Sequence, residues 1–248
     1  MTKYTIAIPA RIASSRLPGK MLRNLGGKPV IQHVIERVKL VKNCNEICVV
    51  TDSQDIVRLA ESLDVKGYLT APECHSGTER IVSVLDKMQG DWIFNVQGDE
   101  PFVEISLIEA LIEKTQSIDA PILTPVYALK SMEEVNNPNI VKVVLDNKNY
   151  ALYFSRSPIP YARDVAKDDW LRKCKYWGHL GIYGYRREIL EVYKNLENSY
   201  LESTESLEQL KFLSNGYRIA THEASGRSVA IDTLEDLIKA EEILGNMK

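Results

Sequence analysis

A cluster of cationic and small polar residues stands near the start of the sequence, in the segment PARIASSRLPGK. Its candidate phosphate-binding side chains are those of Arg11, Ser14, Ser15, Arg16 and Lys20. Cationic groups, hydroxyls and backbone N–H groups are the donors that hold nucleotide phosphates. The segment has neither the GxxxxGK[ST] pattern of a P-loop nor the GxGxxG pattern of a dinucleotide site. By composition alone, a phosphate-binding loop and a solvated charged loop are equally good interpretations.

Two acidic residues each follow a segment that resembles a strand. Asp99 stands in NVQGDEP and Asp232 in IDT. A carboxylate at the end of a strand is well placed to hold Mg²⁺ against triphosphate oxygens. Acidic turns after strands are common, however, and Asp232 could simply cap the helix that follows it. Asp232 becomes a second metal ligand only if the fold brings it beside Asp99.

The segment HSGTER predicts the start of a helix. Ser76 or Thr78 is a suitable N-cap, and Glu79 would lie near the positive end of the helix dipole. The alternative is a binding segment, in which small polar residues and exposed amides contact a base while Arg80 supplies a nearby charge.

The residues above must be positioned by the elements around them. In the first half of the chain, short apolar runs alternate with helical patterns, which is typical of βαβ units around a parallel sheet. In such sheets, ligands bind beyond the carboxyl ends of the strands. We predict strands at Tyr4–Pro9, Glu46–Thr51 and Trp92–Val96, and helices at Lys28–Leu40, Ser53–Leu63 and Ile105–Lys114.

The second half predicts an antiparallel or mixed extension of the sheet. Asp146-Asn147-Lys148-Asn149 is turn chemistry between two strands and indicates a hairpin. The expected strands are Ile140–Leu145, Tyr150–Phe154, His179–Tyr185 and Ser228–Ile231. The expected helices are Glu205–Leu213 and Leu234–Leu244. An irregular stretch is expected over Ser157–Lys175. We therefore predict one α/β domain over 1–248 with an extension around 120–200.

Composition excludes several classes of protein. The formal net charge of -3 provides no global positive field for nucleic acid or an anionic membrane. The four cysteines form no zinc-ligand spacing and are typical of a reduced intracellular protein. No membrane span and no signal peptide is expected, so we predict a cytoplasmic protein.

Together these segments resemble the 3-deoxy-manno-octulosonate cytidylyltransferase (CMP-Kdo synthetase) family. The resemblance rests on PARIASSRLPGK, HSGTER, NVQGDEP, NPNIVKVVLD, ALYFSRSPIP, HLGIYGYR, LEQL and IDT-EDL, in this order over nearly the whole chain. It implies a Rossmann-like, mostly parallel sheet with helices on both faces, of the nucleotide-diphospho-sugar transferase type, and an extension used for dimerisation. It also implies a homodimer that uses Mg²⁺ and CTP to activate the acidic sugar 3-deoxy-D-manno-octulosonate (Kdo) for lipopolysaccharide biosynthesis.

The resemblance further implies roles for individual residues. Asp99 and Asp232 would hold Mg²⁺, and Lys20, Arg11 and Asp99 would be catalytic. The residues implied in nucleotide binding are Arg11, Ser14, Arg16, Lys20, Ser76, Gly77 and Gln97. Those implied in sugar binding are Arg80, Arg156, His179, Tyr183, Glu208 and Gln209. Without the resemblance, Tyr183 and His179 would be interpreted as core residues and Glu208 as part of a solvated helix face.

Several other functions compete with this one. A cytidylyltransferase for sialic acid would share the opening loop, although SGTER, NVQGDEP and YFSR argue against it. A variant acting on 8-amino-Kdo is barely separable by sequence. A non-catalytic nucleotide-binding module would explain the loop but not the two separated carboxylates. A dehydrogenase is disfavoured by the missing GxGxxG pattern.

Overall fold

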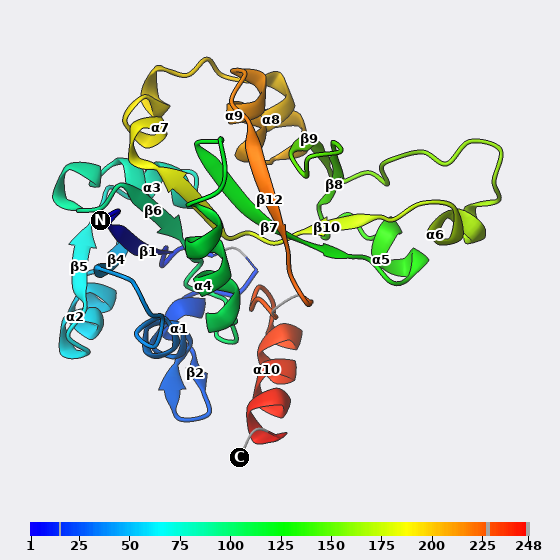
Figure 1. Ribbon diagram of the computed structural model, residues 1–248. Helices are drawn as coiled ribbons and strands as arrows, with labels where there is room; N and C mark the ends of the chain where they lie inside the picture. Colours follow the sequence, from blue (N-terminus) through cyan, green and yellow to red (C-terminus); the bar gives the residue numbers. More distant parts are fainter. Residues whose placement is uncertain (15, 227–228, 247–248) are drawn as a thin grey trace. The chain divides into compact units, whose positions relative to one another are not determined.

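The computed structural model describes residues 1–14, 16–226 and 229–246 (Figure 1). The expectations for Ser15 and Ser228 lie outside the described residues. Contacts divide the chain into two compact units. The first comprises Met1–Ile112, Tyr185–Glu191 and Ser228–Lys248, and the second comprises Glu113–Gly184 and Val192–Arg227. The second unit covers more of the chain than the predicted extension of 120–200. Whether the two units fold as one domain stays a prediction, because compactness does not decide independent folding.

The first unit is built on a parallel sheet. Its elements are β1 (Tyr4–Ala10), β2 (Asn24–Leu25), β3 (Lys28–Pro29), α1 (Val30–Val38), β4 (Glu46–Thr51), α2 (Gln54–Ser62), β5 (Lys66–Leu69), α3 (Gly77–Val82), β6 (Trp92–Asn95), α4 (Ile105–Lys114), α7 (Arg187–Glu191) and α10 (Leu234–Asn246). The strand order is β5-β4-β1-β6, and all these neighbours run parallel. All seven residues of β1 are buried, so helices and loops must cover both faces of the sheet.

The order of these strands fixes where a ligand can bind. From β1 the chain moves outward through β4 to β5, and then returns to place β6 on the other side of β1. Such a reversal leaves a crevice at the carboxyl ends of the two strands on either side of it. The loops after β1 and β6 begin at this crevice.

The second unit contains the antiparallel part of the structure. Its elements are β7 (Ile122–Ala128), α5 (Met132–Asn136), β8 (Lys142–Leu145), β9 (Ala151–Ser155), α6 (Trp170–Lys173), β10 (Trp177–His179), α8 (Tyr200–Glu205), α9 (Gln209–Ser214) and β12 (Ile219–Glu223). Strand β10 pairs antiparallel with β7 and β8, β8 pairs with β9, and β12 runs parallel to β7. The predicted hairpin is confirmed: Asp146 accepts hydrogen bonds from the backbones of Lys148 and Tyr150, and Asn149 adopts φ 60°.

The predicted strand His179–Tyr185 is wrong as one element. It divides into β10 and β11 (Tyr183–Arg186), the strand at which the chain passes from one unit to the other. The Thr124 hydroxyl bonds to the carbonyls of Leu180 and Ile182, 3.2 and 2.7 Å away. The strand is therefore interrupted at residues 180–182, where a buried hydroxyl of β7 lies within hydrogen-bond distance of two carbonyls.

Other predicted boundaries are also wrong. The helix expected at Glu205–Leu213 is two helices, α8 and α9, because Ser206 takes the left-handed conformation at φ 53°. The irregular stretch Ser157–Lys175 contains α6. Residues 229–231 form no strand. The other predicted elements are present, with ends displaced by at most two residues.

A buried charged side chain organises the backbone of the second unit. Lys142 is fully buried, and its Nζ donates to the carbonyls of Asn137, Ile140 and Arg156 at 2.5–2.8 Å. Its pKa is lowered, first by burial and then by the nearby guanidinium of Arg156. Lys142 therefore supplies hydrogen bonds that the loops around β8 do not make for themselves.

No helix in the described part of the chain is long and apolar enough to span a membrane.

Candidate functional site

A pocket of about 190 Å³ lies in the first unit, where the strand order reverses. Its walls come from three segments far apart in the sequence, namely the loops after β1 and β6 and the start of α3, and from Asp232. The lining residues are Pro9, Ala10, Arg11, Lys20, Met21, Cys74, His75, Ser76, Gly77, Arg80, Gln97, Asp99 and Asp232. Residues from all four sequence segments singled out above, PARIASSRLPGK, HSGTER, NVQGDEP and IDT, therefore line one pocket. The segment IDT contributes Asp232 alone.

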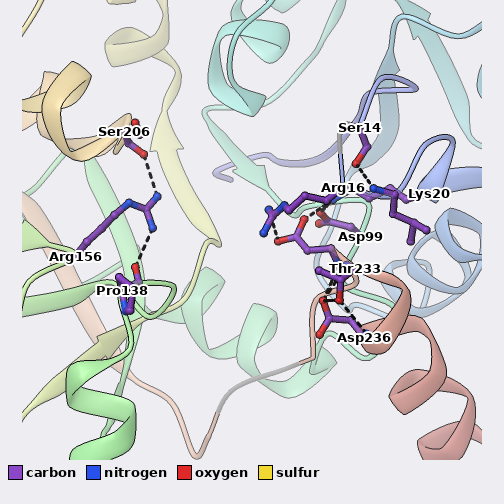
Figure 2. A network of polar contacts seen from close by, with 11 residues as sticks. Ser14, Arg16, Lys20, Asp99, Pro138, Arg156, Ser206, Thr233 and Asp236 are labelled. Carbon is purple, nitrogen blue, oxygen red and sulfur yellow. Dashed lines mark hydrogen bonds and ion pairs between the residues drawn. The ribbon is translucent and has the colours of Figure 1, made fainter.

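Lys20 is at the centre of the charged groups in this pocket. Its side chain is 5% exposed, and its ammonium contacts the carboxylates of both Asp99 and Asp232, the latter at 2.9 Å (Figure 2). The short 3-10 helix Lys20–Leu22 begins after Gly19, which adopts φ 66° and turns the loop back toward the sheet. The two predicted metal ligands thus converge on one cation.

Local hydrogen bonds explain why Asp232 reaches Asp99. The backbone N–H of Ile231 donates to the carbonyl of Asp99 at 2.9 Å, which fixes the neighbouring residue beside the end of β6. Thr233 and Asp236 bond to each other at the start of α10, where the Asp236 carboxylate accepts from the backbone and hydroxyl of Thr233 (Figure 2). Because this pair caps the helix, the Asp232 carboxylate remains available to Lys20 and Arg16.

The charges in the pocket stabilise one another. Burial disfavours the charge on Lys20, but the carboxylates of Asp99 and Asp232 outweigh burial and raise its pKa. Burial likewise acts to raise the pKa of Asp232, but its contacts with Lys20 and Arg16 outweigh this and lower it. Both groups are therefore charged at neutral pH.

The donors present fit a magnesium ion bound together with a nucleotide. Two carboxylates that already hold a cation between them can supply part of an octahedral oxygen shell. Within the described residues, no group of three or more His, Cys, Asp or Glu side chains forms a complete metal site. In proteins, Mg²⁺ is usually held by one or two carboxylates together with substrate phosphates and water.

The remaining loop residues differ in their surroundings. Arg11 is exposed and lines the pocket, whereas Arg16 forms an ion pair with Asp232 at 3.0 Å while its side chain stays 59% exposed. The Ser14 hydroxyl accepts a 3.4 Å hydrogen bond from the backbone of Leu17, and so supports the turn of the loop. The predicted phosphate contacts of these three residues stay predictions.

The start of α3 forms the opposite wall. Ser76 is the N-cap, and its hydroxyl accepts from the backbone N–H of Glu79 at 3.1 Å, so the capping interpretation is confirmed. A Cβ on Gly77 would stand 2.9 Å from Nε2 of Gln97 and 3.1 Å from Pro9. A larger residue would therefore displace the Gln97 amide, and glycine lets this wall approach the ends of β1 and β6 without that shift.

Arg80 lies in the same wall, and its side chain is 3% exposed. Its guanidinium pairs with Asp52 at 3.3 Å and also donates to the Thr70 hydroxyl and the Ala71 carbonyl. Its predicted sugar contact stays a prediction, since the donors described here are directed to protein groups.

A second polar cluster lies in the second unit. His179 is bonded to the Thr124 hydroxyl at 2.9 Å and lies 5.3 Å from Tyr183, measured between ring centroids. Burial lowers the pKa of His179 to about 3, so the ring is neutral. Burial and then the carboxylate of Glu208 raise the pKa of Tyr183. His179 and Tyr183 therefore form a largely dehydrated pair of polar groups beside the Glu208 carboxylate.

Gln209 follows Glu208 in the sequence and is 2% exposed. Within the described part of the chain, its Nε2 finds no hydrogen-bond acceptor. A buried amide without an acceptor is unfavourable, so a polar ligand that offered one would be favoured. This agrees with the predicted sugar-binding role of Gln209, which stays a prediction.

Arg156 has a structural environment in the second unit. Its guanidinium donates to the carbonyls of Glu205, Pro138 and Ser206 at 2.7, 3.1 and 3.3 Å (Figure 2). The Glu205 carboxylate in turn accepts from the backbone N–H of Arg156 at 2.9 Å. Arg156 therefore holds the left-handed break between α8 and α9, and its predicted sugar contact stays a prediction.

Sequence reasoning missed Asp52. Its carboxylate accepts hydrogen bonds from the backbone N–H of Ile12 and from the guanidinium of Arg80. The signal was available, because Asp52 directly follows the strand Glu46–Thr51, much as Asp99 follows the end of β6. Cys74 and His75 also line the pocket, and neither was assigned a role.

Comparison with known proteins agrees with this geometry. The family described as Cytidylyltransferase matches residues 5–219. A 3-deoxy-manno-octulosonate cytidylyltransferase of Francisella tularensis subsp. holarctica is 41% identical, over 98% of this chain and 99% of that protein. The protein of the same name from Porphyromonas gingivalis is 43% identical, over 96% of this chain and 95% of that protein.

Solved structures extend the comparison to the fold. A CMP:2-keto-3-deoxy-manno-octonic acid synthetase complexed with CTP matches with a TM-score of 0.92 and 38% identity, covering all of both chains. A 4-diphosphocytidyl-2C-methyl-D-erythritol synthase from Anaerococcus prevotii has a TM-score of 0.64 at 17% identity, over 98% of this chain and 99% of that one, and shows the shared fold alone. The chain therefore belongs to the cytidylyltransferase family, among the relatives named 3-deoxy-manno-octulosonate cytidylyltransferases.

Proposed function

We propose that this protein transfers CMP from CTP to Kdo and releases pyrophosphate, as a step of lipopolysaccharide biosynthesis. The observation that carries the proposal is the convergence of Asp99 and Asp232 on Lys20, in a pocket also lined by Arg11. The names of the full-length relatives and the CTP complex of a structural relative support the choice of substrates.

CTP would occupy the pocket of the first unit. Its phosphates need cations and amides, which the loop from Pro9 to Lys20 provides in a chain whose formal net charge is only -3. Arg11, Arg16 and Lys20 would offset the negative charge of the triphosphate. Gln97 would lie against the nucleotide, and its amide is already oriented by a 2.9 Å hydrogen bond to Asn95.

Mg²⁺ is the proposed cofactor, held by Asp99 and Asp232. When bound, it would neutralise charge on the triphosphate and help to orient the reacting phosphate. A cation of the protein already lies between these carboxylates, which is why we regard the pair as suited to a metal ion.

The acceptor sugar would use the cluster of the second unit. A sugar carboxylate and ring hydroxyls require a mixed set of donors and acceptors. His179, Tyr183, Glu208 and Gln209 offer such a set, and the buried amide of Gln209 lacks an acceptor within the described residues. Arg80 and Arg156 belong to the proposed sugar-binding residues as positioning groups rather than as direct ligands, because their guanidinium groups bond to protein atoms.

In the proposed reaction, the C2 hydroxyl oxygen of Kdo forms a bond to the α-phosphorus of CTP. The bond between that phosphorus and the bridging oxygen of the β-phosphate breaks, and pyrophosphate leaves with the electron pair. The hydroxyl proton passes to water. Since little covalent chemistry is required of the protein, catalysis would come from positioning and from charge neutralisation by Lys20 and Arg11.

The test is pyrophosphate release from each of the four nucleoside triphosphates with Mg²⁺, with and without Kdo, 8-amino-Kdo and sialic acid. We expect release only from CTP and only with Kdo. Release with 8-amino-Kdo or sialic acid instead would replace the proposed acceptor. CTP binding without release for any sugar would support a non-catalytic binding module and overturn the proposal.

A homodimer and a cytoplasmic location remain predictions of the resemblance. Light scattering on the purified protein at several concentrations tests the first, and cell fractionation tests the second.

A further inference from the structure

The carboxylate of Asp52 joins two walls of the pocket in the first unit. It stands directly after β4, on the strand next to β1, and its side chain is 6% exposed. None of the roles proposed above uses it. Each of its two oxygens bonds to a different segment, and both segments carry residues that line the pocket.

The first segment is the loop after β1. Oδ1 of Asp52 accepts the backbone N–H of Ile12 at 2.9 Å. Ile12 immediately follows Arg11, whose exposed side chain lines the pocket. Holding the Ile12 amide therefore fixes the point from which the Arg11 side chain leaves the backbone.

The second segment runs from the end of β5 into α3. Oδ2 of Asp52 lies 3.3 Å from the guanidinium of Arg80, which also donates to the Thr70 hydroxyl and to the Ala71 carbonyl. Arg80 thus ties both ends of the segment 70–80 to one carboxylate. The pocket-lining residues Cys74, His75, Ser76 and Gly77 lie between those ends.

We propose that Asp52 is a positioning residue for the nucleotide, which sets the separation between the Arg11 loop and the wall formed by 74–77. The inference rests on the proposed function for the identity of the ligand, CTP. A buried carboxylate that is bonded on both oxygens can hold two segments rigidly, because leaving either oxygen unbonded would be unfavourable. Pockets that position phosphates depend on such preorganisation, and a displacement of about 1 Å can lower rates by about a hundredfold.

The same strand offers a matched control. Glu46 is the first residue of β4, and its side chain is 8% exposed. It accepts the backbone N–H of Gln89 at 2.7 Å and pairs with Lys66 at 2.7 Å. Glu46 is therefore a buried carboxylate with one amide and one cationic partner, like Asp52, but it lies at the opposite end of β4 from the pocket.

The test compares Asp52→Asn and Arg80→Lys with Glu46→Gln. Each variant is assayed for the KM of CTP, the KM of Kdo and kcat, for CTP affinity by calorimetry without sugar, and for stability by urea unfolding. We expect Asp52→Asn and Arg80→Lys to weaken CTP binding and raise its KM by about tenfold. For Asp52→Asn, whose residue has no proposed role toward the sugar, the KM of Kdo should stay within about twofold of the wild-type value. Glu46→Gln should lower stability while leaving the KM of CTP unchanged.

Two results would overturn the inference. One is an unchanged CTP affinity in the folded Asp52→Asn variant, and the other is an equal loss of affinity in Glu46→Gln, which would indicate a general effect of lost stability. If Asp52→Asn does not fold, Arg80→Lys decides, because it keeps a positive charge near Asp52 while a single ammonium cannot reproduce the three contacts of the guanidinium. Loss of pyrophosphate release in the unchanged protein would instead refute the proposed function, and calorimetric CTP binding would still test Asp52.

Discussion

Replacing Lys20 by methionine tests whether the ammonium occupies a site suited to a metal ion. Methionine retains much of the apolar length of the side chain, so packing changes little while the charge is removed. The carboxylates of Asp99 and Asp232 then face one another without the cation that both contact in the structure. We expect the variant to be less stable and to regain stability when Mg²⁺ is added.

The magnitude follows from the exposure of the groups. The side chain of Lys20 is 5% exposed and that of Asp99 is 18% exposed, so solvent screens their contact only slightly. A charged hydrogen bond of this kind contributes about 1.5–3 kcal/mol to the free energy of unfolding. The Asp232 side chain is 39% exposed, and solvent reduces its contact to about 1 kcal/mol or less. The expected loss in the free energy of unfolding is therefore about 3 kcal/mol in EDTA. Mg²⁺ at a hundred times its Kd would return about 2.7 kcal/mol.

The assay is urea unfolding of both proteins in EDTA and in Mg²⁺, without nucleotide. Adding Mg²⁺ should raise the free energy of unfolding of the variant by at least about 1.4 kcal/mol more than that of wild type. This difference corresponds to tenfold weaker Mg²⁺ binding in wild type, where the ammonium of Lys20 occupies the site. Lys28→Met is the control. Lys28 pairs with Glu36 on the surface, where both side chains are more than a third exposed, so we expect at most about 1 kcal/mol and no dependence on Mg²⁺. Equal Mg²⁺ stabilisation of wild type and Lys20→Met would refute the reasoning.

Three further predictions concern single residues. Because burial lowers the pKa of His179 to about 3, the protonated ring favours the unfolded chain, so stability is fully present above pH 6.5 and decreases as pH falls from 6.5 toward 3. The loss is at most about 1.4 kcal/mol per pH unit, and unfolding curves of His179→Gln should lack it. Equal pH dependence in both proteins would contradict this. Arg156→Ala should raise the KM of Kdo more than that of CTP. It should also destabilise the protein by about 1.5–3 kcal/mol, since three carbonyls lose a charged donor. A selective effect on the KM of CTP would show that the residue is misassigned. Gly77→Ala should weaken CTP binding measured by calorimetry, because its Cβ would stand 2.9 Å from Gln97, whereas Gly245→Ala in α10 meets no atom within 4 Å and should leave binding unchanged.

The first half of the fold could be predicted because its local signals agree with its tertiary structure. Buried parallel strands read as short apolar runs, and Glu46–Thr51 and Ile105–Lys114 are found with the predicted bounds. The pocket could be predicted as well, since the carboxyl ends of parallel strands meet at one edge of the sheet. The position of Asp232 beside Asp99 could not, because it depends on one backbone bond from Ile231 that no local pattern encodes.

The second half was harder because side chains override local preference there. The segment from Glu205 to Leu213 has the composition of a single helix, but Arg156 and Glu205 stabilise the left-handed residue Ser206 near its start. The strand at His179 is interrupted where the side chain of Thr124 approaches the carbonyls of Leu180 and Ile182, a tertiary contact that no local pattern encodes. Asp52 was missed because a residue before a helix is first considered as a cap, while its actual partners are 40 and 28 residues away.

The contribution of α10 to the first unit has a consequence for the order of events during synthesis. Leu17, Leu25 and Val30 form a buried cluster with Ile231 and Ala240, so the segment that carries Lys20 is supported by residues translated more than 200 positions later. Asp232 arrives with the same late segment. A ribosome-bound chain that has emerged only as far as α9 therefore contains every strand of the parallel sheet, but neither the second carboxylate nor the apolar support beneath the loop. Nascent chains should accordingly acquire nucleotide binding abruptly, when residues 229–246 leave the exit tunnel, rather than gradually as the sheet grows.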